Sequence, residues 1–248
     1  MDFSGQHIVV TGASTGIGRA TAEKIAKLGG KVTVIARSRD KLEAMREVLG
    51  DAVHVAPADV ADAAALKAAL DIAADFAPID GLFCNAGIGG TFAPIEAYTD
   101  ENFDGLMAVN MVAHFRTVRQ VFPAMKQRGK GSIVITGSLA SERGMAMNVA
   151  YVMSKHAMLG LARAAALEGA AHGIRVNCLV PGFIDTPLMD GIPPDQLDHL
   201  AGNIPQNRMG SSEETANVAA FLLSDEASHV TGQSWAVDGG VLGTLAVR

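Results

Sequence analysis

The stretch VVTGASTGIG, residues 9–18, joins a short apolar run to an Ala-rich segment of helical period. Its glycines Gly12, Gly16 and Gly18 allow the backbone to turn sharply and to approach a pyrophosphate, and a helix beginning near Ile17 offers free N–H groups and a positive dipole end. A glycine motif alone is weak evidence. Here it lies between a predicted strand and a predicted helix, which favours a dinucleotide-binding loop over a tight turn that only permits close packing.

The rest of the chain alternates short apolar runs, rich in β-branched residues, with longer segments of helical period. Because hydrophobicity in the runs is continuous, both faces of each predicted strand are expected to be covered. We therefore predict a doubly wound α/β fold, with seven parallel strands and helices on both faces. The predicted strands are residues 7–11, 31–36, 52–56, 80–84, 132–136, 175–180 and 234–237, and the predicted helices are 17–28, 39–49, 63–76, 101–125, 150–172 and 213–223.

The chain of 248 residues is predicted to be a single domain, 1–248, without repeats or a linker. One irregular stretch, residues 183–210, contains four prolines and mixed polarity. A long interruption in a compact domain is more often a binding loop or lid than a defect, so we predict a substrate loop here. A surface insertion without function is the alternative.

Composition narrows the function classes. The chain is 49% hydrophobic and 19% charged with 27 glycines, which excludes disorder, and its net charge of −6 argues against nucleic-acid binding. It shows no signal-peptide pattern and no apolar segment of membrane-spanning length, so we expect a cytoplasmic protein without a membrane partner. Cys84 and Cys178 lie in apolar runs and are expected to be reduced core residues. The seven histidines show no ligand spacing, so we predict no metal.

YVMSK, residues 151–155, places Tyr151 four residues before Lys155. On a helix these positions share one face. A phenol with an ordinary pKa near 10 is a poor base at neutral pH, and a nearby ammonium is expected to lower that pKa toward working pH. The pair is therefore a candidate acid/base device, with an ordinary amphipathic surface pair as the alternative.

Together these motifs resemble the shorter branch of the short-chain dehydrogenase/reductase family. The resemblance covers essentially the whole chain: the TGASTGIG loop, Asn85-Ala86-Gly87, Asn110, Ser138, Tyr151 with Lys155, Pro181-Gly182 with Thr186, and the final VDGG at 237–240. It implies an oxidoreductase that uses a nicotinamide dinucleotide. The implied cofactor-binding residues are Gly12, Ser14, Thr15, Gly16, Ile17, Gly18, Arg37, Ser38, Asp59, Val60, Asn85, Ala86, Gly87, Tyr151, Lys155, Pro181, Gly182, Ile184 and Thr186.

The catalytic set that the resemblance implies is Asn110, Ser138, Tyr151 and Lys155. Ser138 follows a strand at the carboxyl edge, where open α/β sheets bind ligands, and its hydroxyl suits a substrate oxygen. Relatives use a helix irregularity near the position of Asn110 to bind a water that links the lysine to solvent. The alternatives are a helix cap for Ser138 and a buried, satisfied polar side chain for Asn110.

The cofactor preference rests on the end of the second predicted strand, where NAD-preferring sites usually carry an acidic residue. Here the strand is followed by Arg37 and Ser38, which suit a 2′-phosphate. NADP(H) is therefore favoured over NAD(H), although Thr15 stands where many NADP-using relatives carry a second basic residue. Asp59 matches a position that binds the adenine edge, with a helix cap as its alternative.

The expected substrate is a compact lipophilic secondary alcohol or ketone, cyclic ones included. The segments after Ser138 and Gly182 are expected to supply its apolar wall, namely Leu139, Met145, Met147, Phe183, Leu188 and Met189. The alternative enzyme is a 3-oxoacyl-carrier-protein reductase, for which the basic cluster Lys126, Arg128 and Lys130 offers a contact. A cofactor-sensing scaffold without turnover is the alternative outside enzymes.

Self-association is expected as well. The tail VLGTLAVR, residues 241–248, is apolar with no obvious place in the core, and related proteins use this end and two long helices to form tetramers. We therefore predict a homotetramer.

Overall fold

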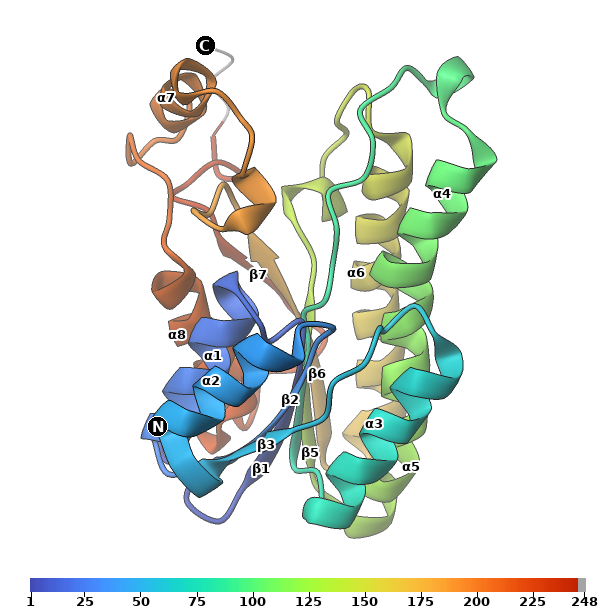
Figure 1. Ribbon diagram of the computed structural model, residues 1–248, viewed down its shortest axis with the longest axis vertical. Coiled ribbons are helices and arrows are strands. Elements are labelled where there is room, and N and C mark those ends of the chain that lie inside the picture. The colour runs from blue at the N-terminus through green and yellow to red at the C-terminus, as the bar shows by residue number, and fades with distance from the viewer. Residues whose placement is uncertain (245–248) are drawn as a thin grey trace.

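The computed structural model describes residues 1–244, and its seven strands form one parallel sheet (Figure 1). The strand order is β3-β2-β1-β4-β5-β6-β7, which confirms the predicted doubly wound topology. The strands are β1 (His7–Thr11), β2 (Lys31–Ile35), β3 (Val53–Val55), β4 (Gly81–Cys84), β5 (Gly131–Thr136), β6 (Ile174–Pro181) and β7 (Ser234–Val237).

Helices cover both faces of this sheet. In Figure 1, α1, α2 and α8 lie on one side, and α3, α5 and α6 lie on the other. Contacts between α1 and α8, and between α5 and both α3 and α6, join the helices within each layer. The helices are α1 (Gly16–Lys27), α2 (Arg39–Leu49), α3 (Ala63–Phe76), α4 (Asp100–Met107), α5 (Ala113–Arg128), α6 (Val149–Ala170), α7 (Pro194–Gly202) and α8 (Ser212–Leu223).

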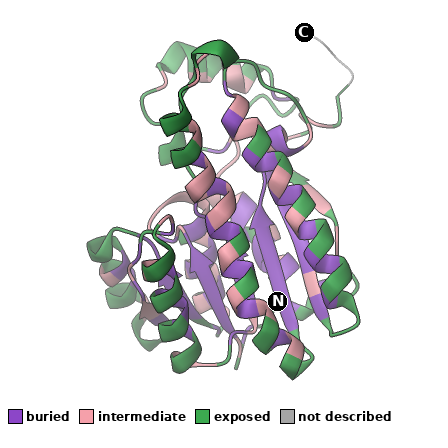
Figure 2. Cartoon of the chain, turned by 90° about the vertical axis from the view of Figure 1, so that its right-hand side faces the viewer, coloured by how far each residue is buried: buried purple, intermediate pink, exposed green. Residues whose placement is uncertain are grey.

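Successive residues of the central strands serve two separate cores. Along β5, Ile133 and Ile135 pack into the cluster beneath α3, α5 and α6, whereas Val134 packs into the cluster beneath α1, α2 and α8. All three side chains are fully buried, and Figure 2 shows the strands buried along most of their length. Burial on both faces is the reason that the strands read as continuous apolar runs.

The predicted helix at 101–125 is interrupted. A π-helix, η3 (Ala108–Val112), joins α4 to α5 without a break in direction, and Asn110 lies within it. The period of an uninterrupted apolar pattern does not reveal one extra residue per turn. Short π segments of this kind are frequent at functional sites.

The predicted irregular stretch, 183–210, contains one α-helix that the sequence analysis did not predict, after the short 3₁₀ helix η5 (Pro187–Met189). Helix α7 begins at Pro194, with Pro193 as its N-cap, where a missing N–H removes no helical hydrogen bond. The two ends of the stretch are joined: Asp185 N donates to Gly210 O at 2.9 Å, and Gly210 N donates to Phe183 O at 3.0 Å. The stretch is therefore a long loop whose two ends are held together by hydrogen bonds.

Part of the apolar tail, residues 241–244, belongs to the described chain. Leu242 packs against the core cluster beneath α6, and its N–H donates to an Asp238 carboxylate oxygen at 2.7 Å. The expectation that the tail has no place in the core is wrong for this residue. Residues 245–248 lie outside the described chain.

Candidate active site

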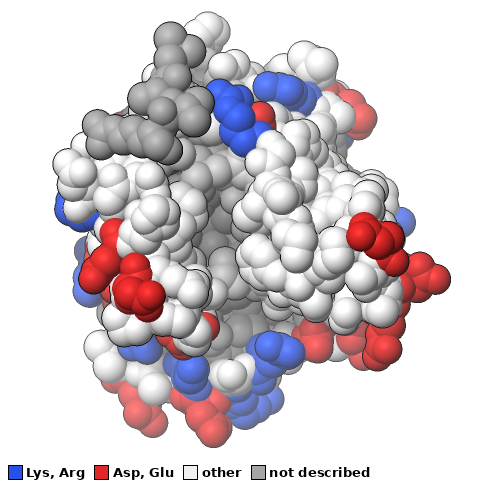
Figure 3. All heavy atoms as spheres, turned by 90° about the horizontal axis from the view of Figure 1, so that it is seen from above, with Lys and Arg blue, Asp and Glu red and all other residues white. Residues whose placement is uncertain are grey.

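A cavity of about 870 Å³ lies above the carboxyl ends of the strands. Its walls come from the glycine loop, from the segments that follow β2, β3, β4 and β5, and from residues 181–192. Neighbours β1 and β4 mark the point where the strand order reverses, which is where open α/β sheets bind ligands. Figure 3 shows the hollow from above, between two largely uncharged walls.

The glycine loop packs against the segment after β4 with no room for side chains. An ideal Cβ on Gly12 would lie 2.8 Å from Ala86 Cα, and one on Gly18 would lie 2.3 Å from Gly12 O. Gly12 also has a φ of +68°, which favours glycine. Both glycines are therefore required by the local geometry.

The first turn of α1 is suited to an anion. Its N-cap, Thr15, makes no side-chain capping bond, and no acidic residue lies in the first turn. The N–H groups at a helix start lack helical partners and carry the positive end of the dipole, so they attract phosphate oxygens. The predicted loop residues Ser14, Thr15, Gly16 and Ile17 line the cavity here.

Buried side chains fix the wall that Asn85–Gly90 forms. Thr11 Oγ1 accepts from Asn85 N at 3.0 Å and from Ala86 N at 3.2 Å. Asn110, fully buried, accepts from Ile88 N and donates to Ile88 O, both at 2.8 Å. Asn110 is thus a satisfied polar residue, as the alternative reading stated, and it also positions a wall of the cavity.

Two residues that the sequence analysis did not assign to the site fix the same wall. His114 Nε2 bonds Ala86 O at 2.6 Å, and Asn148 Nδ2 donates to Gly89 O at 2.8 Å. Both side chains are 1% exposed. Burial and the Lys155 charge lower the pKa of His114 to about 4, so its ring is neutral at neutral pH. The sequence offers one signal for His114: it follows Asn110 by four residues, a spacing that places both side chains on the same face of a helix.

Tyr151 and Lys155 reach the cavity from α6. The Lys155 ammonium lies 5.7 Å from the centre of the Tyr151 ring and donates to Thr136 O at 3.0 Å. Burial lowers the pKa of Lys155 to about 8, which leaves it mostly protonated at pH 7.

The expectation that Lys155 lowers the pKa of the phenol is wrong in this structure. Burial raises the pKa of Tyr151, and a hydrogen bond with the Ser138 side chain opposes the rise. The ammonium lies near the ring and bonds the Thr136 carbonyl, which leaves the desolvation of the phenolate as the larger effect.

Ser138 is both a helix cap and a cavity residue. Its Oγ accepts from Ala140 N at 3.2 Å, at the start of the 3₁₀ helix η4 (Leu139–Ser141). Ser141 Oγ accepts from Ser138 N at 3.1 Å and donates to Lys155 O at 2.8 Å. These bonds fix Ser138 relative to α6, so the cap and the predicted role in catalysis are compatible.

The far end of the cavity is lined by Arg37, Ser38, Asp59 and Val60. Arg39, two residues after Arg37, pairs with Glu43 at 3.5 Å and does not line the cavity. Asp59 accepts from Ala61 N at 3.0 Å, and the cap of α3 is Asp62.

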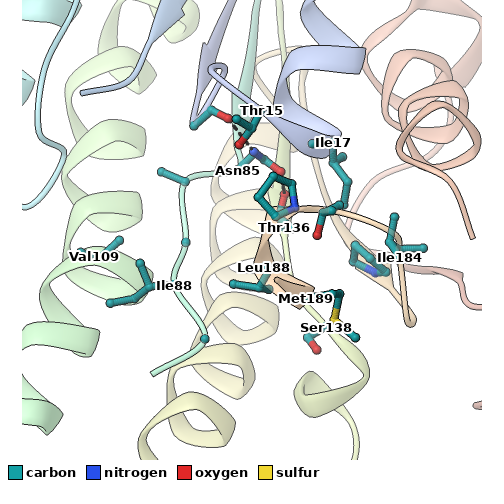
Figure 4. A pocket seen from close by; sticks show the side chains of 18 of the residues that line it. Thr15, Ile17, Asn85, Ile88, Val109, Thr136, Ser138, Ile184, Leu188 and Met189 are labelled. Carbon is teal, nitrogen blue, oxygen red and sulfur yellow. Dashed lines mark hydrogen bonds between the residues drawn. The ribbon is translucent and has the colours of Figure 1, made fainter. Parts of the chain in front are cut away.

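Residues 181–192 cover the other end. Pro181, Gly182, Ile184 and Thr186 line the cavity as predicted. Leu188 extends toward Ile88 and Val109 in Figure 4, and its Cδ1 lies 3.6 Å from the place of a Cβ on Gly89.

The apolar wall differs from the predicted one. Leu188 and Met189 line the cavity, but Leu139, Met145, Met147 and Phe183 do not. Met145 and Met147 are instead exposed on the surface, at 40% and 50%. Their places are taken by residues that the sequence analysis did not name for this role: Ile88, Phe92, Val109 and Ile192.

These residues fit a nicotinamide dinucleotide. The close approach at Gly12, the free start of α1 and the guanidinium of Arg37 suit a pyrophosphate and a phosphorylated ribose. Tyr151, Lys155, Ile184 and Thr186 surround the end where a nicotinamide ring would lie. The predicted cofactor residues, Asn85 and Gly87 included, thus line one continuous cavity, apart from Gly18, which lies under the loop.

No group of His, Cys, Asp and Glu side chains within residues 1–244 has the arrangement of a metal site. None of the helices described there has the length and apolar character that crossing a bilayer requires. Cys84 and Cys178 are both buried and unpaired.

Comparison with known proteins places this site in a family. Residues 12–242 match the family model described as enoyl-(acyl carrier protein) reductase. Levodione reductase of Leifsonia aquatica is 35% identical, over 96% of this chain and 94% of that protein. The 3-oxoacyl-(acyl-carrier-protein) reductase of Escherichia coli (strain K12) is 35% identical, over 97% and 99%.

A solved structure agrees with these matches. A protein from Beutenbergia cavernae, described as a candidate NAD(P)-dependent gluconate 5-dehydrogenase and solved with NADP bound at low occupancy, superposes with a TM-score of 0.92. It is 34% identical, and the match covers 98% of this chain and 99% of that one. The chain belongs to the short-chain dehydrogenase/reductase family and has the fold of its oxidoreductases.

Gly18→Ala is expected to lower the free energy of unfolding by about 2 kcal/mol, because the added methyl would collide with Gly12 O and the Asn85 side chain. Gly105→Ala is the matched control. Gly105 is also helical, but nothing lies within 4 Å of its added methyl, so this change should stabilise by about 0.5–1 kcal/mol. Urea unfolding measures both values. Equal effects of the two substitutions would contradict the close packing at Gly18.

Proposed function

We propose that this chain is an NADP(H)-dependent oxidoreductase that interconverts a lipophilic secondary alcohol and its ketone, with Tyr151 as the acid/base. The observation that carries the proposal is the convergence of Tyr151, Ser138 and Lys155 on the cavity that the glycine loop also lines. The proposal includes a cytoplasmic location, where free cysteines such as Cys84 and Cys178 are common.

The acid/base roles follow from the environment of each group. A phenol whose pKa is raised by burial keeps its proton at neutral pH, so Tyr151 is suited to give that proton to a ketone oxygen. Ser138, fixed by its cap bonds, holds the same oxygen as charge develops on it. Lys155 supplies the fixed positive charge beside the phenol. A nicotinamide dinucleotide bound in the cavity supplies the hydride donor or acceptor.

The charges around the cavity favour a neutral substrate. The charged residues that line it are Arg37, Asp59, Lys155 and Asp190. Arg37 and Asp59 follow β2 and the edge strand β3, and two strands, β1 and β4, separate β2 from β5, which Ser138 follows. Lys155 donates to Thr136 O. A substrate carboxylate would therefore meet Asp190 and apolar side chains. A relative that is 38% identical carries the name 2,5-dichloro-2,5-cyclohexadiene-1,4-diol dehydrogenase, which fits the preference for a neutral cyclic alcohol.

A 3-oxoacyl-(acyl-carrier-protein) reductase is the second candidate, favoured by the Escherichia coli relative. The basic cluster proposed to contact a carrier is not at the cavity mouth. Lys126 and Arg128 end α5 and Lys130 precedes β5, so all three lie at the amino edge of the sheet, opposite the cavity. Arg128 also bonds Ile79 O, and Lys130 pairs with Asp225 at 3.6 Å. Stimulation of activity by an acyl carrier would favour this candidate.

Tyr151→Phe removes the hydroxyl and keeps the ring. We expect kcat for ketone reduction to fall by about 10²–10⁴-fold, since the proton donor is lost. The dissociation constant for NADPH should stay within about threefold of wild type, as the ring still fills its place. A panel of neutral ketones and alcohols with both cofactors measures kcat. Retained activity in the variant would remove the acid/base role, and binding without turnover in wild type would favour a cofactor-sensing scaffold.

Arg37→Ala is expected to lower kcat/KM with NADPH at least about tenfold and to leave kcat/KM with NADH nearly unchanged, because only the former carries the 2′-phosphate. Arg39→Ala is the control, since Arg39 is two residues away but pairs with Glu43. Initial rates at varied cofactor concentration measure both. An equal loss with the two cofactors would show that Arg37 does not select NADP(H).

We also propose a homotetramer. Phe115 on α5 and Leu167 on α6 are 48% and 83% exposed, and these two helices lie against each other, so they offer apolar area for a subunit contact. Sedimentation at micromolar concentration should give a mass near four times 25.7 kDa. A monomer under these conditions would contradict the proposal.

A further inference from the structure

His114 is a buried histidine that the catalytic roles above do not use. It is the second residue of α5, directly after the π-helix, and is 1% exposed. Asn110 lies one helical turn earlier and is fully buried. Both side chains face the segment that follows β4: Asn110 bonds the backbone of Ile88, and His114 bonds the carbonyl of Ala86.

The bond to Ala86 defines the state of the imidazole. A carbonyl oxygen only accepts, so Nε2 must carry the hydrogen that lies between it and Ala86 O. Nδ1 is then an acceptor, and it has no partner within the described residues. The neutral ring, favoured by burial and by the charge of Lys155 on α6, is the form that keeps this arrangement.

Ala86 is held on three sides by these contacts. Its N–H donates to Thr11 Oγ1 at 3.2 Å, its Cα lies against Gly12, and its carbonyl accepts from His114. The peptide that begins at this carbonyl leads to Gly87, where an added Cβ would lie 3.8 Å from Lys155 Nζ. A shift of the Ala86 carbonyl would therefore alter the cavity wall both at the glycine loop and beside Lys155.

We propose that His114 is a positioning residue for the nicotinamide dinucleotide, because its Nε2–H holds the Ala86 carbonyl and so keeps the 85–88 wall against the glycine loop. This role rests on the proposed cofactor binding. In this role the Nε2–H donor of His114, and not the volume of its ring, determines the affinity for the cofactor.

Three substitutions of His114 distinguish the effect of losing the N–H donor from the effect of changing the side-chain volume. His114→Gln keeps an N–H at a reach similar to Nε2, His114→Asn places an N–H too close to the backbone to reach Ala86, and His114→Leu has no donor. We expect the Asn and Leu variants to raise the dissociation constant for NADPH roughly tenfold, since a buried carbonyl loses its partner, and the Gln variant to stay within about threefold of wild type. Enhancement of NADPH fluorescence on titration measures the constant.

A second buried histidine provides the control for stability. His7 begins β1 at the opposite edge of the sheet, where its ring bonds Ala77 O at 3.0 Å and Thr33 Oγ1 at 2.8 Å. His7→Leu is expected to lower the thermal unfolding midpoint without changing the dissociation constant. The same change in affinity for His7→Leu and His114→Leu would mean that lost stability alone explains the result, and would overturn the proposal.

The remaining outcomes are also decisive. Wild-type affinity in His114→Leu, or an equal loss in the Gln and Asn variants, overturns the positioning role while the proposed function stands. If His114→Leu does not fold, the comparison of Gln with Asn decides. Failure of the wild type to bind either nicotinamide dinucleotide overturns the proposed function and this role together, which distinguishes the two failures.

At saturating cofactor, kcat of the Asn variant should fall less than its KM for NADPH rises, because the proton donor Tyr151 is unchanged.

Discussion

The structure of the site depends on one close approach between two backbones. The glycine loop after β1 and the segment after β4 meet where Gly12 packs against Ala86. The two backbones are so close that neither Gly12 nor Gly18 has room for a side chain. Parallel pairing of β1 with β4 brings the two segments to the same edge. The cavity opens directly beside this contact, so backbone atoms define its wall at Gly12 and Ala86.

Burial is the second constraint, and it acts in opposite directions on the pKa values of the two ionisable groups that reach the cavity from α6. It raises the pKa of the Tyr151 phenol and lowers that of the Lys155 ammonium, because each neutral form is easier to bury. At neutral pH the phenol keeps its proton, and the ammonium keeps most of its charge because its lowered pKa, about 8, still lies above 7. Lys155 keeps that charge while buried by donating to Thr136 O, and Ser141 links the backbone of Lys155 to Ser138. Lys155 and Ser138 are therefore held by one connected set of bonds.

Much of this arrangement was predictable from the sequence, since it depends on local patterns. Continuous apolar runs such as that of β5 predict strands buried on two faces, and TGASTGIG before a helix predicts the loop that packs on Ala86. What the sequence could not predict depends on contacts between distant segments. Met147 lies near Tyr151 in sequence, yet its backbone carbonyl accepts from Ala93 N and its side chain is exposed, so it does not line the cavity. The π-helix is hidden for a related reason, since it shows in the structure together with a contact between distant segments, the bond of Asn110 to Ile88.

The same distinction separates the proposed catalytic residues from the residues that hold the cavity wall. Tyr151 and Lys155 carry a recognisable chemistry at a recognisable spacing, whereas His114 and Asn148 act on the carbonyls of Ala86 and Gly89, which belong to a loop far away in the chain. A buried carbonyl without a donor is costly, so a loop that follows a strand and bends away from the ladder must obtain donors from the helices packed above it. The wall at 85–90 obtains them from the π-helix region and from the start of α6. The helices that carry Asn110, Tyr151 and Lys155 therefore also hold the backbone of the 85–90 wall, so in the proposed function the same packed helices position both the proton donor and the cofactor.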